Sequence, residues 1–270
     1  MRKVFRREPG ITAAVAVIML LAGAIAFAQD GVVAPNAHLK AEGIPPISAA
    51  LAAKVAPYTE FRPRTFASWH PAKREMIVAT RATNTAQLFR IGAPLASPAQ
   101  LTNFGDPVRF GTWWPPRPDT LVFVRDTGGN EQNQIYRQDP GGKEPVLLTD
   151  PARTHRPIGI NRARNRLFVA STDLDKTGRR ENPTLDLSLL DPLNPSAARK
   201  IATFPGTGWF AANFSFDDRQ LALIEFKSVN ETFVWVVDVA TGERRRVLPA
   251  AADAIAQPIA TQNVDFTRDG

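Results

Sequence analysis

FASWHPAKREMIVAT, residues 66–80, decides the fold because the chain repeats its pattern three more times. In each copy an apolar strand enters a polar turn and a second apolar strand follows. The other copies are GTWWPPRPDTLVFVR (111–125), IGINRARNRLFVAS (158–171) and NFSFDDRQLALIEF (213–226). One equivalent position recurs at spacings of 45, 46 and 54 residues and holds Met76, Leu121, Leu167 and Leu221. NVDFTRDG (263–270) begins a fifth copy, in which Val264–Phe266 is predicted to be a strand that runs into a turn.

The second half of each unit repeats as well. Third strands are predicted at AQLFRIG (86–92), NQIYRQDP (133–140), DLSLLDP (186–192) and VWVVDVATG (234–242). Fourth strands are predicted at AQLTNFG (99–105), PVLLTDP (145–151), RKIATFP (199–205) and RRRVLPA (244–250). Four strands per unit at this period are typical of a β-propeller blade, whereas a solenoid of the same period would be helical. The apolar residues alternate with period two, which excludes helices.

We therefore expect an all-β protein whose β-propeller has four four-stranded blades plus the first strand of a fifth. The predicted blades are residues 61–105, 106–152, 153–206 and 207–252, and the next one starts at 260–270. Four blades and one strand leave an incomplete ring, so the chain is interpreted as a fragment of a longer protein. A closed four-bladed ring is the alternative, in which the last strand completes blade one and Thr267–Gly270 is surplus.

The N-terminus is predicted to be an export signal. Residues 1–10 are basic, Ile11–Ala28 carry no charge, and Ala-Phe-Ala precedes Gln29, so cleavage is expected between Ala28 and Gln29. An uncleaved membrane anchor is the alternative, although 18 Ala- and Gly-rich residues are short for a span. The mature chain would then be periplasmic or secreted and would meet the membrane only during export. Residues 29–60 form a lead-in segment, with a short helix expected at Ser48–Val55.

Composition excludes several classes of function. The chain has no cysteine, which excludes disulfides and thiolate metal sites. Its net charge of +7 includes +3 from residues 1–28, so the remainder carries +4. Basic runs such as Arg244–Arg246 lie beside strand patterns without interleaved aromatic residues. They are interpreted as charged turns and edge strands, and no nucleic-acid binding is expected.

Three stretches of the first two units resemble the N-terminal propeller of exported prolyl oligopeptidase family serine peptidases, the group of dipeptidyl aminopeptidases and acylaminoacyl peptidases. They are FRPRTFASWHPAKREMIVATRATNTAQLFR (61–90), QLTNFGDPVRFGTWWPP (100–116) and LVFVRDTGGNEQNQIYRQD (121–139), followed by LLTD (147–150). The most specific part is RDTGGNEQNQIY (125–136). The resemblance covers Ile44–Gly270. It departs from the family in two turns, Trp114–Pro118 and Ile160–Arg164. These lack the Asp-Gly pair that ends the common Phe-Ser-Pro-Asp-Gly turn of such propellers.

The resemblance implies a seven- or eight-bladed propeller followed by an α/β-hydrolase domain with a Ser–His–Asp triad, the serine lying in a G-x-S-x-G elbow. No serine of this chain has that spacing. His70 lies in a blade turn and His155 at the entry to a blade, where hydrogen-bonded or surface histidines are expected rather than general bases. We therefore expect no catalytic residue, no cofactor and no activity in this chain alone. Its expected partners are the missing hydrolase domain and short peptide substrates, for which the propeller acts as a gate.

The resemblance also implies acids that bind a free N-terminal amine, and Glu131, Asp126 and Arg125 are the candidate substrate-binding residues. The alternative, which the residues favour, is a hairpin loop in which Asp126 caps backbone N–H groups and Gly128 and Gly129 supply positive φ.

A metal site is not expected. Thr172–Asn182 imitates the start of a calcium loop, but the twelfth position is Thr184 instead of an acid. The five tryptophans could line a binding surface, with packing between blades as the default: Trp69, Trp113, Trp114, Trp209 and Trp235. A second function belongs to another class: a TolB-like propeller that binds proteins without catalysis. The blade-two stretch favours the peptidase.

Overall fold

The computed structural model describes residues 31–82, 84–142, 144–174, 183–250 and 258–268. The chain divides into two units, Met1–Arg62 and Pro63–Gly270. In the first unit, helix α2 spans Ala49–Thr59, and its N-cap Ser48 accepts a hydrogen bond from the N–H of Leu51 at 3.1 Å. The predicted helix is therefore confirmed and continues beyond Val55, with Pro57 in its last turn.

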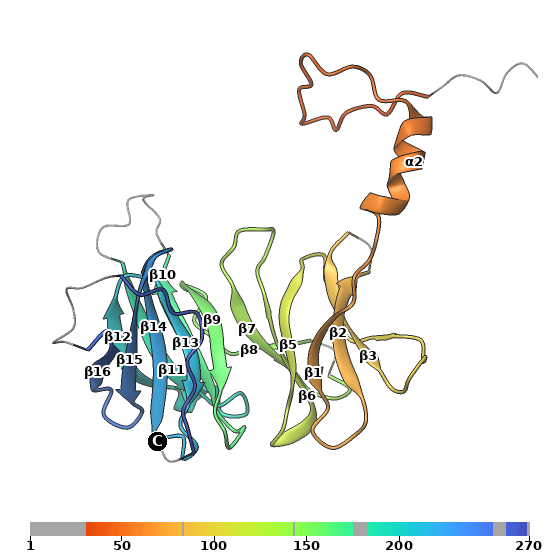
Figure 1. The fold of residues 1–270 in the computed structure, drawn as a ribbon. Helices are drawn as coiled ribbons and strands as arrows, with labels where there is room; N and C mark the ends of the chain where they lie inside the picture. Colours follow the sequence, from red (N-terminus) through yellow and green to blue (C-terminus); the bar gives the residue numbers. More distant parts are fainter. Residues whose placement is uncertain (1–30, 83, 143, 175–182, 251–257, 269–270) are drawn as a thin grey trace, which may run out of the picture. The chain divides into compact units, whose positions relative to one another are not determined.

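The second unit contains four antiparallel four-stranded sheets, each a meander in chain order (Figure 1). The strands of blade one are β1 (Thr65–Trp69), β2 (Met76–Arg81), β3 (Ala86–Ile91) and β4 (Ala99–Gln100). Those of blade two are β5 (Val108–Trp114), β6 (Arg117–Arg125), β7 (Gln134–Gln138) and β8 (Val146–Leu147).

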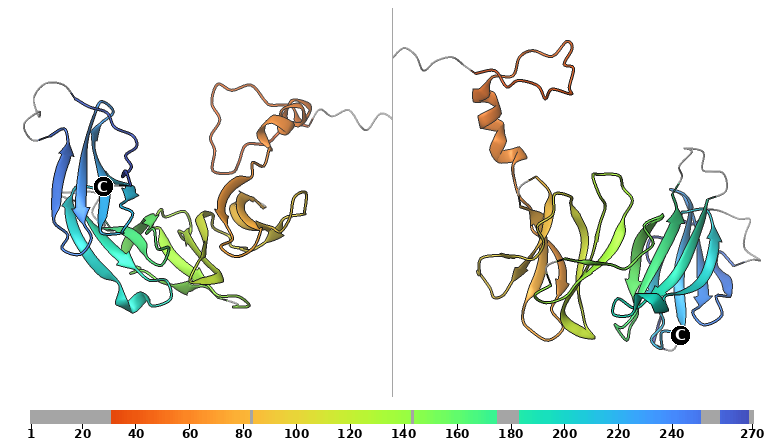
Figure 2. Two further views of the ribbon diagram at one scale, coloured as in Figure 1. Left: turned by 60° about the horizontal axis from the view of Figure 1, so that its bottom comes forward. Right: turned by 180° about the vertical axis from the view of Figure 1, so that it is seen from behind.

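Blades three and four have longer outer strands. Blade three contains β9 (Arg153–Ile160), β10 (Leu167–Asp173), β11 (Thr184–Leu190) and β12 (Arg199–Pro205), with a 3-10 helix η1 at Pro195–Ala197. Blade four contains β13 (Trp209–Phe214), β14 (Gln220–Ser228), β15 (Glu231–Asp238) and β16 (Arg244–Leu248). The predicted propeller is confirmed: within this unit the four blades follow one another around an incomplete ring (Figure 2).

The alternating pattern of the second strands explains why the blades stack. In β6, Leu121 and Phe123 enter the apolar cluster that blade two shares with blade one. The intervening Val122 and Val124 enter the cluster shared with blade three. Successive side chains of a strand point to opposite faces, so one strand supplies two interfaces. The strand β10 does the same between blades two and four.

Polar contacts tie neighbouring blades together at their turns. In blade one, Nδ1 of His70 accepts hydrogen bonds from the N–H groups of Ala72 and Lys73, while Nε2 lies 3.3 Å from Asp119 Oδ1 of blade two. Since Nδ1 only accepts here, Nε2 carries the proton toward Asp119. The ammonium of Lys73 lies 2.5 Å from the same carboxylate oxygen. These contacts with Lys73 and His70 lower the pKa of Asp119.

Gly111 marks a close approach between blades one and two. A Cβ atom built on it would lie 2.3 Å from Leu88 Cδ1. Leu88 is 1% exposed and belongs to the cluster between these blades. The absence of a side chain at Gly111 therefore lets β5 pack directly on Leu88.

Residues 258–268, which include the described part of the fifth repeat, lie against blade four. The N–H of Thr232 donates to the carbonyl of Ile259 at 2.8 Å, and Asn213 Nδ2 donates to Asp265 Oδ1 at 2.7 Å. No ladder is assigned to Val264–Phe266 among the described residues. A β-strand requires backbone pairing with another strand, and Val264–Phe266, where a strand is predicted, contacts blade four through the side chain of Asp265 without such pairing among the described residues.

Candidate functional site

The end of β6 and the loop that follows it carry the three candidate binding residues of blade two: Arg125 is the last residue of the strand, and Asp126 and Glu131 lie in the loop. Asp126 is 1% exposed, and its Oδ2 accepts a hydrogen bond from the N–H of Glu131 at 3.2 Å. Gly128 and Gly129 have φ of 63° and 71°. These contacts confirm the interpretation in which Asp126 caps the loop and the glycines allow its turn.

Arg125 is packed against aromatic rings rather than presented to a ligand. Its guanidinium carbon lies 4.4 Å from the ring centre of Phe104 and 4.8 Å from that of Tyr136. A cation within about 6 Å of an aromatic ring centre gains electrostatic and packing energy, and Arg125 has two such contacts. The position of Arg125 therefore stabilises the strand that leads into the loop.

Glu131 differs from the other two candidates. It is exposed, has φ of 59°, and its carboxylate makes no hydrogen bond or ion pair with the described residues. Arg109 Nη2 instead lies 3.6 Å from the buried carboxylate of Asp126. Of the three predicted residues, Glu131 alone combines exposure with a free charge. Its carboxylate could pair with a cation from solution.

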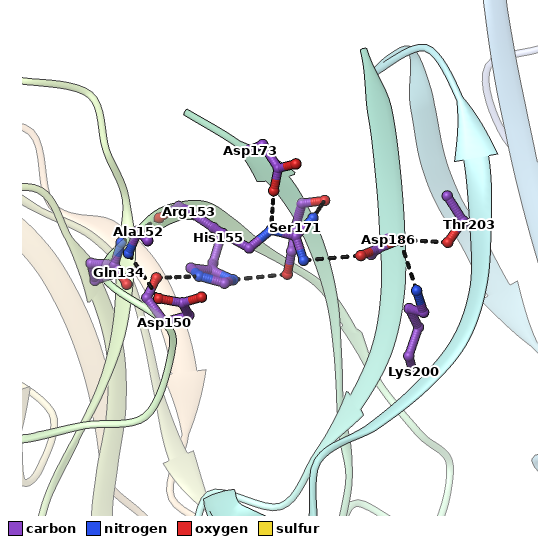
Figure 3. Close-up of polar contacts among 10 residues, drawn as sticks. All are labelled: Gln134, Asp150, Ala152, Arg153, His155, Ser171, Asp173, Asp186, Lys200 and Thr203. Atoms are coloured by element: carbon purple, nitrogen blue, oxygen red, sulfur yellow. Dashed lines mark hydrogen bonds and ion pairs between the residues drawn. The ribbon is translucent and has the colours of Figure 1, made fainter. Parts of the chain in front are cut away.

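A serine–histidine pair lies in blade three (Figure 3). His155 Nε2 lies 2.8 Å from the carbonyl oxygen of Asp150, and Nδ1 lies 2.8 Å from Ser171 Oγ. A carbonyl can only accept, so Nε2 carries the proton and Ser171 donates to Nδ1. Both side chains are 5% exposed. Burial lowers the pKa of His155.

This pair lacks two features of a hydrolytic site. The group that orients His155 is the backbone carbonyl of Asp150 rather than a carboxylate, so a developing imidazolium would have weak support. The hydroxyl of Ser171 is buried, which denies it to a substrate. Both predicted histidines, His70 and His155, are thus hydrogen-bonded structural residues, and both are buried rather than on the surface.

An ion-pair ladder crosses the strands beside this pair (Figure 3). Arg153 Nη1 lies 3.0 Å from Asp186 Oδ2, and its Nε lies 2.7 Å from Asp173 Oδ1. Lys200 Nζ is 3.7 Å from Asp186 Oδ1, and Thr203 donates a hydrogen bond to the same oxygen. Burial alone would raise the pKa of Asp186, but Thr203 and Arg153 lower it below its usual value. The ladder ties the strands of blade three together.

A cavity of about 500 Å³ lies between the innermost strands of blades one, two and three. Its wall includes Phe66, Trp69 and Arg164, which are exposed. The sequence pattern pointed to this site only through the suggestion that tryptophans could line a binding surface. Trp113, Trp114 and Trp209 are buried between blades, whereas Trp69 is 61% exposed.

Other predicted features lie outside the described residues. The expected cleavage site, Ala28 and Gln29, belongs to residues 1–30, and most of the calcium-like loop belongs to residues 175–182. In the described ranges, no group of three or more His, Asp or Glu side chains is arranged to hold a metal ion. Those ranges also contain no helix of the length and apolar character that a membrane span requires.

No family model and no curated protein matches the chain. Solved structures do. TolB from Acinetobacter baumannii is 16% identical with a TM-score of 0.48, covering 68% of this chain and 43% of its own. Oligogalacturonate lyase from Vibrio parahaemolyticus is 14% identical with a TM-score of 0.53. The match covers 71% of this chain and 54% of the lyase chain. A prolyl endopeptidase is 13% identical with a TM-score of 0.46, covering 69% and 26%.

The four consecutive four-stranded sheets, together with the likeness to the oligogalacturonate lyase structure, define the class of protein through its fold. The chain is a β-propeller protein, built from consecutive four-stranded blades. It spans about half the length of the TolB and oligogalacturonate lyase structures that it matches. Unrelated functions share the propeller fold, so the function must be argued from the residues of this chain.

Proposed function

We propose that this chain is the substrate-gating propeller of an exported serine peptidase of the prolyl oligopeptidase family. The intact protein would hydrolyse short peptides with an α/β-hydrolase domain that follows the propeller. The observation that carries the proposal is the stretch from Arg125 to Tyr136. It resembles the blade-two sequence of these peptidases, and it forms the end of β6, the capped loop and the start of β7.

The propeller would act by selection rather than by chemistry. Blades joined by apolar clusters and turn-to-turn contacts form a stiff frame, and a stiff frame can admit short peptides while excluding folded proteins. Glu131 supports this role because it presents a free carboxylate from a loop that Asp126 holds in place. A charge-assisted hydrogen bond to a peptide's N-terminal ammonium would fix the peptide's register.

The nucleophile is assigned to the hydrolase domain. Ser171 and His155 are buried and lack a carboxylate partner, so the propeller supplies no triad from this pair. Export would place the enzyme in the periplasm or outside the cell. The mature chain would begin at Gln29 after removal of residues 1–28.

A serine-reactive fluorophosphonate probe tests the proposal on the native protein. We expect labelling of the intact protein and hydrolysis of chromogenic dipeptide or N-acylaminoacyl substrates, but no cleavage of a folded protein such as native ribonuclease. The chain of 270 residues expressed alone should not be labelled. A native protein that is neither labelled nor hydrolytic would overturn the proposal and favour the TolB-like binding module.

A further inference from the structure

The cavity among blades one, two and three has an apolar wall and one charged group. Phe66 and Trp69 of β1 face it, with ring centres 5.4 Å apart, and Ile158 and Ile160 of β9 line the opposite side. Among the described residues of the lining, Arg164 is the single charged one. A volume of about 500 Å³ is typical of small-ligand sites, which combine apolar walls with a few placed polar groups.

Arg164 is free to bind an anion. Its guanidinium makes no hydrogen bond or ion pair with the described residues. The neighbouring arginines are both engaged: Arg162 with the carbonyl of Phe214, and Arg166 with Asp191. A free cation beside an apolar wall favours a ligand that carries a negative charge next to an apolar group.

The backbone of Arg164 adds a second, independent observation. Its φ is 56°, in the left-handed region where a side chain other than Asn or Asp is uncommon. The matching position in blade four, Asp218, has φ of 59° and carries one of the residues that tolerate this conformation. An arginine at this position is conformationally costly, and such costs concentrate at functional sites.

The strands that line the cavity also offer backbone groups. β1, β5 and β9 are each the first strand of their sheet, so one edge of each is unpaired in the sheet order. An extended peptide can bind such an edge through main-chain hydrogen bonds while its side chains fill apolar pockets. Peptides therefore fit this cavity better than an apolar anion without a backbone.

We propose that the cavity binds the carboxyl end of a short peptide. Arg164 pairs with the terminal carboxylate, Trp69 and Phe66 contact an apolar C-terminal side chain, and the strand edges contact the peptide backbone. The site goes beyond the proposed gating role, because it requires only the propeller and involves no bond cleavage.

The test uses calorimetric titration of the purified protein with three probes: N-acetyl-Ala-Ala-Phe, its C-terminal amide, and 3-phenylpropionate. We expect the acid peptide to bind most tightly. Arg164→Asn should lower its affinity about tenfold, because a hydrogen-bonded charge pair is lost. The amide should bind the variant and the wild type equally. Trp69→Ala should lower the affinity for both the acid peptide and the amide.

Two controls separate binding from folding and from net charge. Arg164→Asn places a tolerant residue at positive φ, so it should not lower the thermal midpoint. Arg219→Asn removes the same charge from an exposed side chain on the corresponding turn of blade four, outside the cavity lining, and should leave binding unchanged.

Equal affinity for acid and amide, or no effect of Arg164→Asn, would overturn the carboxylate assignment. Equal affinity for 3-phenylpropionate and the acid peptide would overturn the peptide assignment. Binding is measured without hydrolysis, so either failure leaves the proposed peptidase function untouched. Conversely, a native protein without peptidase activity would leave this site standing.

Discussion

Asp218 of blade four binds the backbone of Arg162 in blade three: its Oδ1 accepts a hydrogen bond from the N–H of Arg162 at 2.5 Å. Its Oδ2 accepts from the N–H of Ala163 at 2.9 Å and from Asn161 Nδ2 at 3.0 Å. One carboxylate thus fixes the turn of the preceding blade. The same principle joins Asp119 of blade two to His70 of blade one.

Replacing Asp218 tests how much this contact stabilises the propeller. Glycine adopts φ of 59° without cost, so Asp218→Gly removes the carboxylate and leaves the backbone unstrained. We expect the free energy of unfolding to fall by about 2 kcal/mol, because three hydrogen bonds to a charged group are lost. Urea denaturation measures the change. Leu95→Gly is the matched control, since Leu95 also has positive φ, at 62°, but is fully exposed. It should be neutral or stabilising, and an equal loss in both variants would contradict the role of the carboxylate.

Gly111→Ala should loosen the interface between blades one and two. The new methyl group would meet Leu88 at 2.3 Å, and Leu88 is enclosed. Overpacking of this kind costs about 1–3 kcal/mol. Gly92→Ala is the control, because a Cβ there meets nothing within 4 Å. The double variant with Gly111→Ala and Leu88→Ala should lose less free energy of unfolding than the two single variants lose in sum. Strict additivity in this cycle would show that the two residues do not meet.

The buried His155 should make stability depend on pH near neutrality. Burial lowers its pKa in the folded state below the ordinary value of 6.5. The unfolded chain then binds a proton more readily, so the free energy of unfolding is largest above pH 6.5 and falls as the pH drops toward the folded pKa. Thermal midpoints at pH 7.5 and 5.5 measure this difference. His155→Asn should reduce it, whereas His38→Asn, at an exposed position outside the propeller unit, should not. An unchanged difference in His155→Asn would assign the pH dependence to other groups.

Glu131→Gln tests the proposed contact with a peptide amine. The carboxylate has no partner among the described residues, so the variant should unfold at the same temperature as the wild type. In the native enzyme, we expect KM for substrates with a free N-terminal amine to rise about tenfold, because a charge-assisted contact is lost. N-acylated substrates should show no change. Glu144→Gln, at another exposed acid of blade two, is the control. Equal effects on both substrate types would contradict amine recognition.

The fold could be predicted from the sequence because blade packing imposes a simple pattern. Leu121 and Leu167 recur at one position of the repeat, and the structure buries both in second strands. The lengths of the fourth strands could not be predicted. β4 and β8 have two residues each, whereas β12 has seven. An outermost strand has one neighbour and little burial, so its residue pattern constrains its length weakly.

The candidate site was only partly predictable. The loop role of Asp126 follows from local turn chemistry, which the sequence displays directly. The cavity could not be predicted in this way, because Trp69 and Trp113 both lie in strands and their sequence patterns look alike. Only the packing of the blades leaves Trp69 exposed and buries Trp113. The unusual backbone of Arg164 depends on the turn geometry, which its Asn-Arg-Ala-Arg context does not specify.

The alternation along β6 has a consequence for how such a chain can change over evolution. Inserting or deleting one residue within this strand would exchange its two sets of apolar side chains. The packing would then be disrupted at both interfaces, the one with blade one and the one with blade three. An added residue in a hairpin connection leaves both interfaces between blades unchanged. Length differences among proteins descended from the same ancestor should therefore gather in the connections, and the second strands should keep a constant residue count.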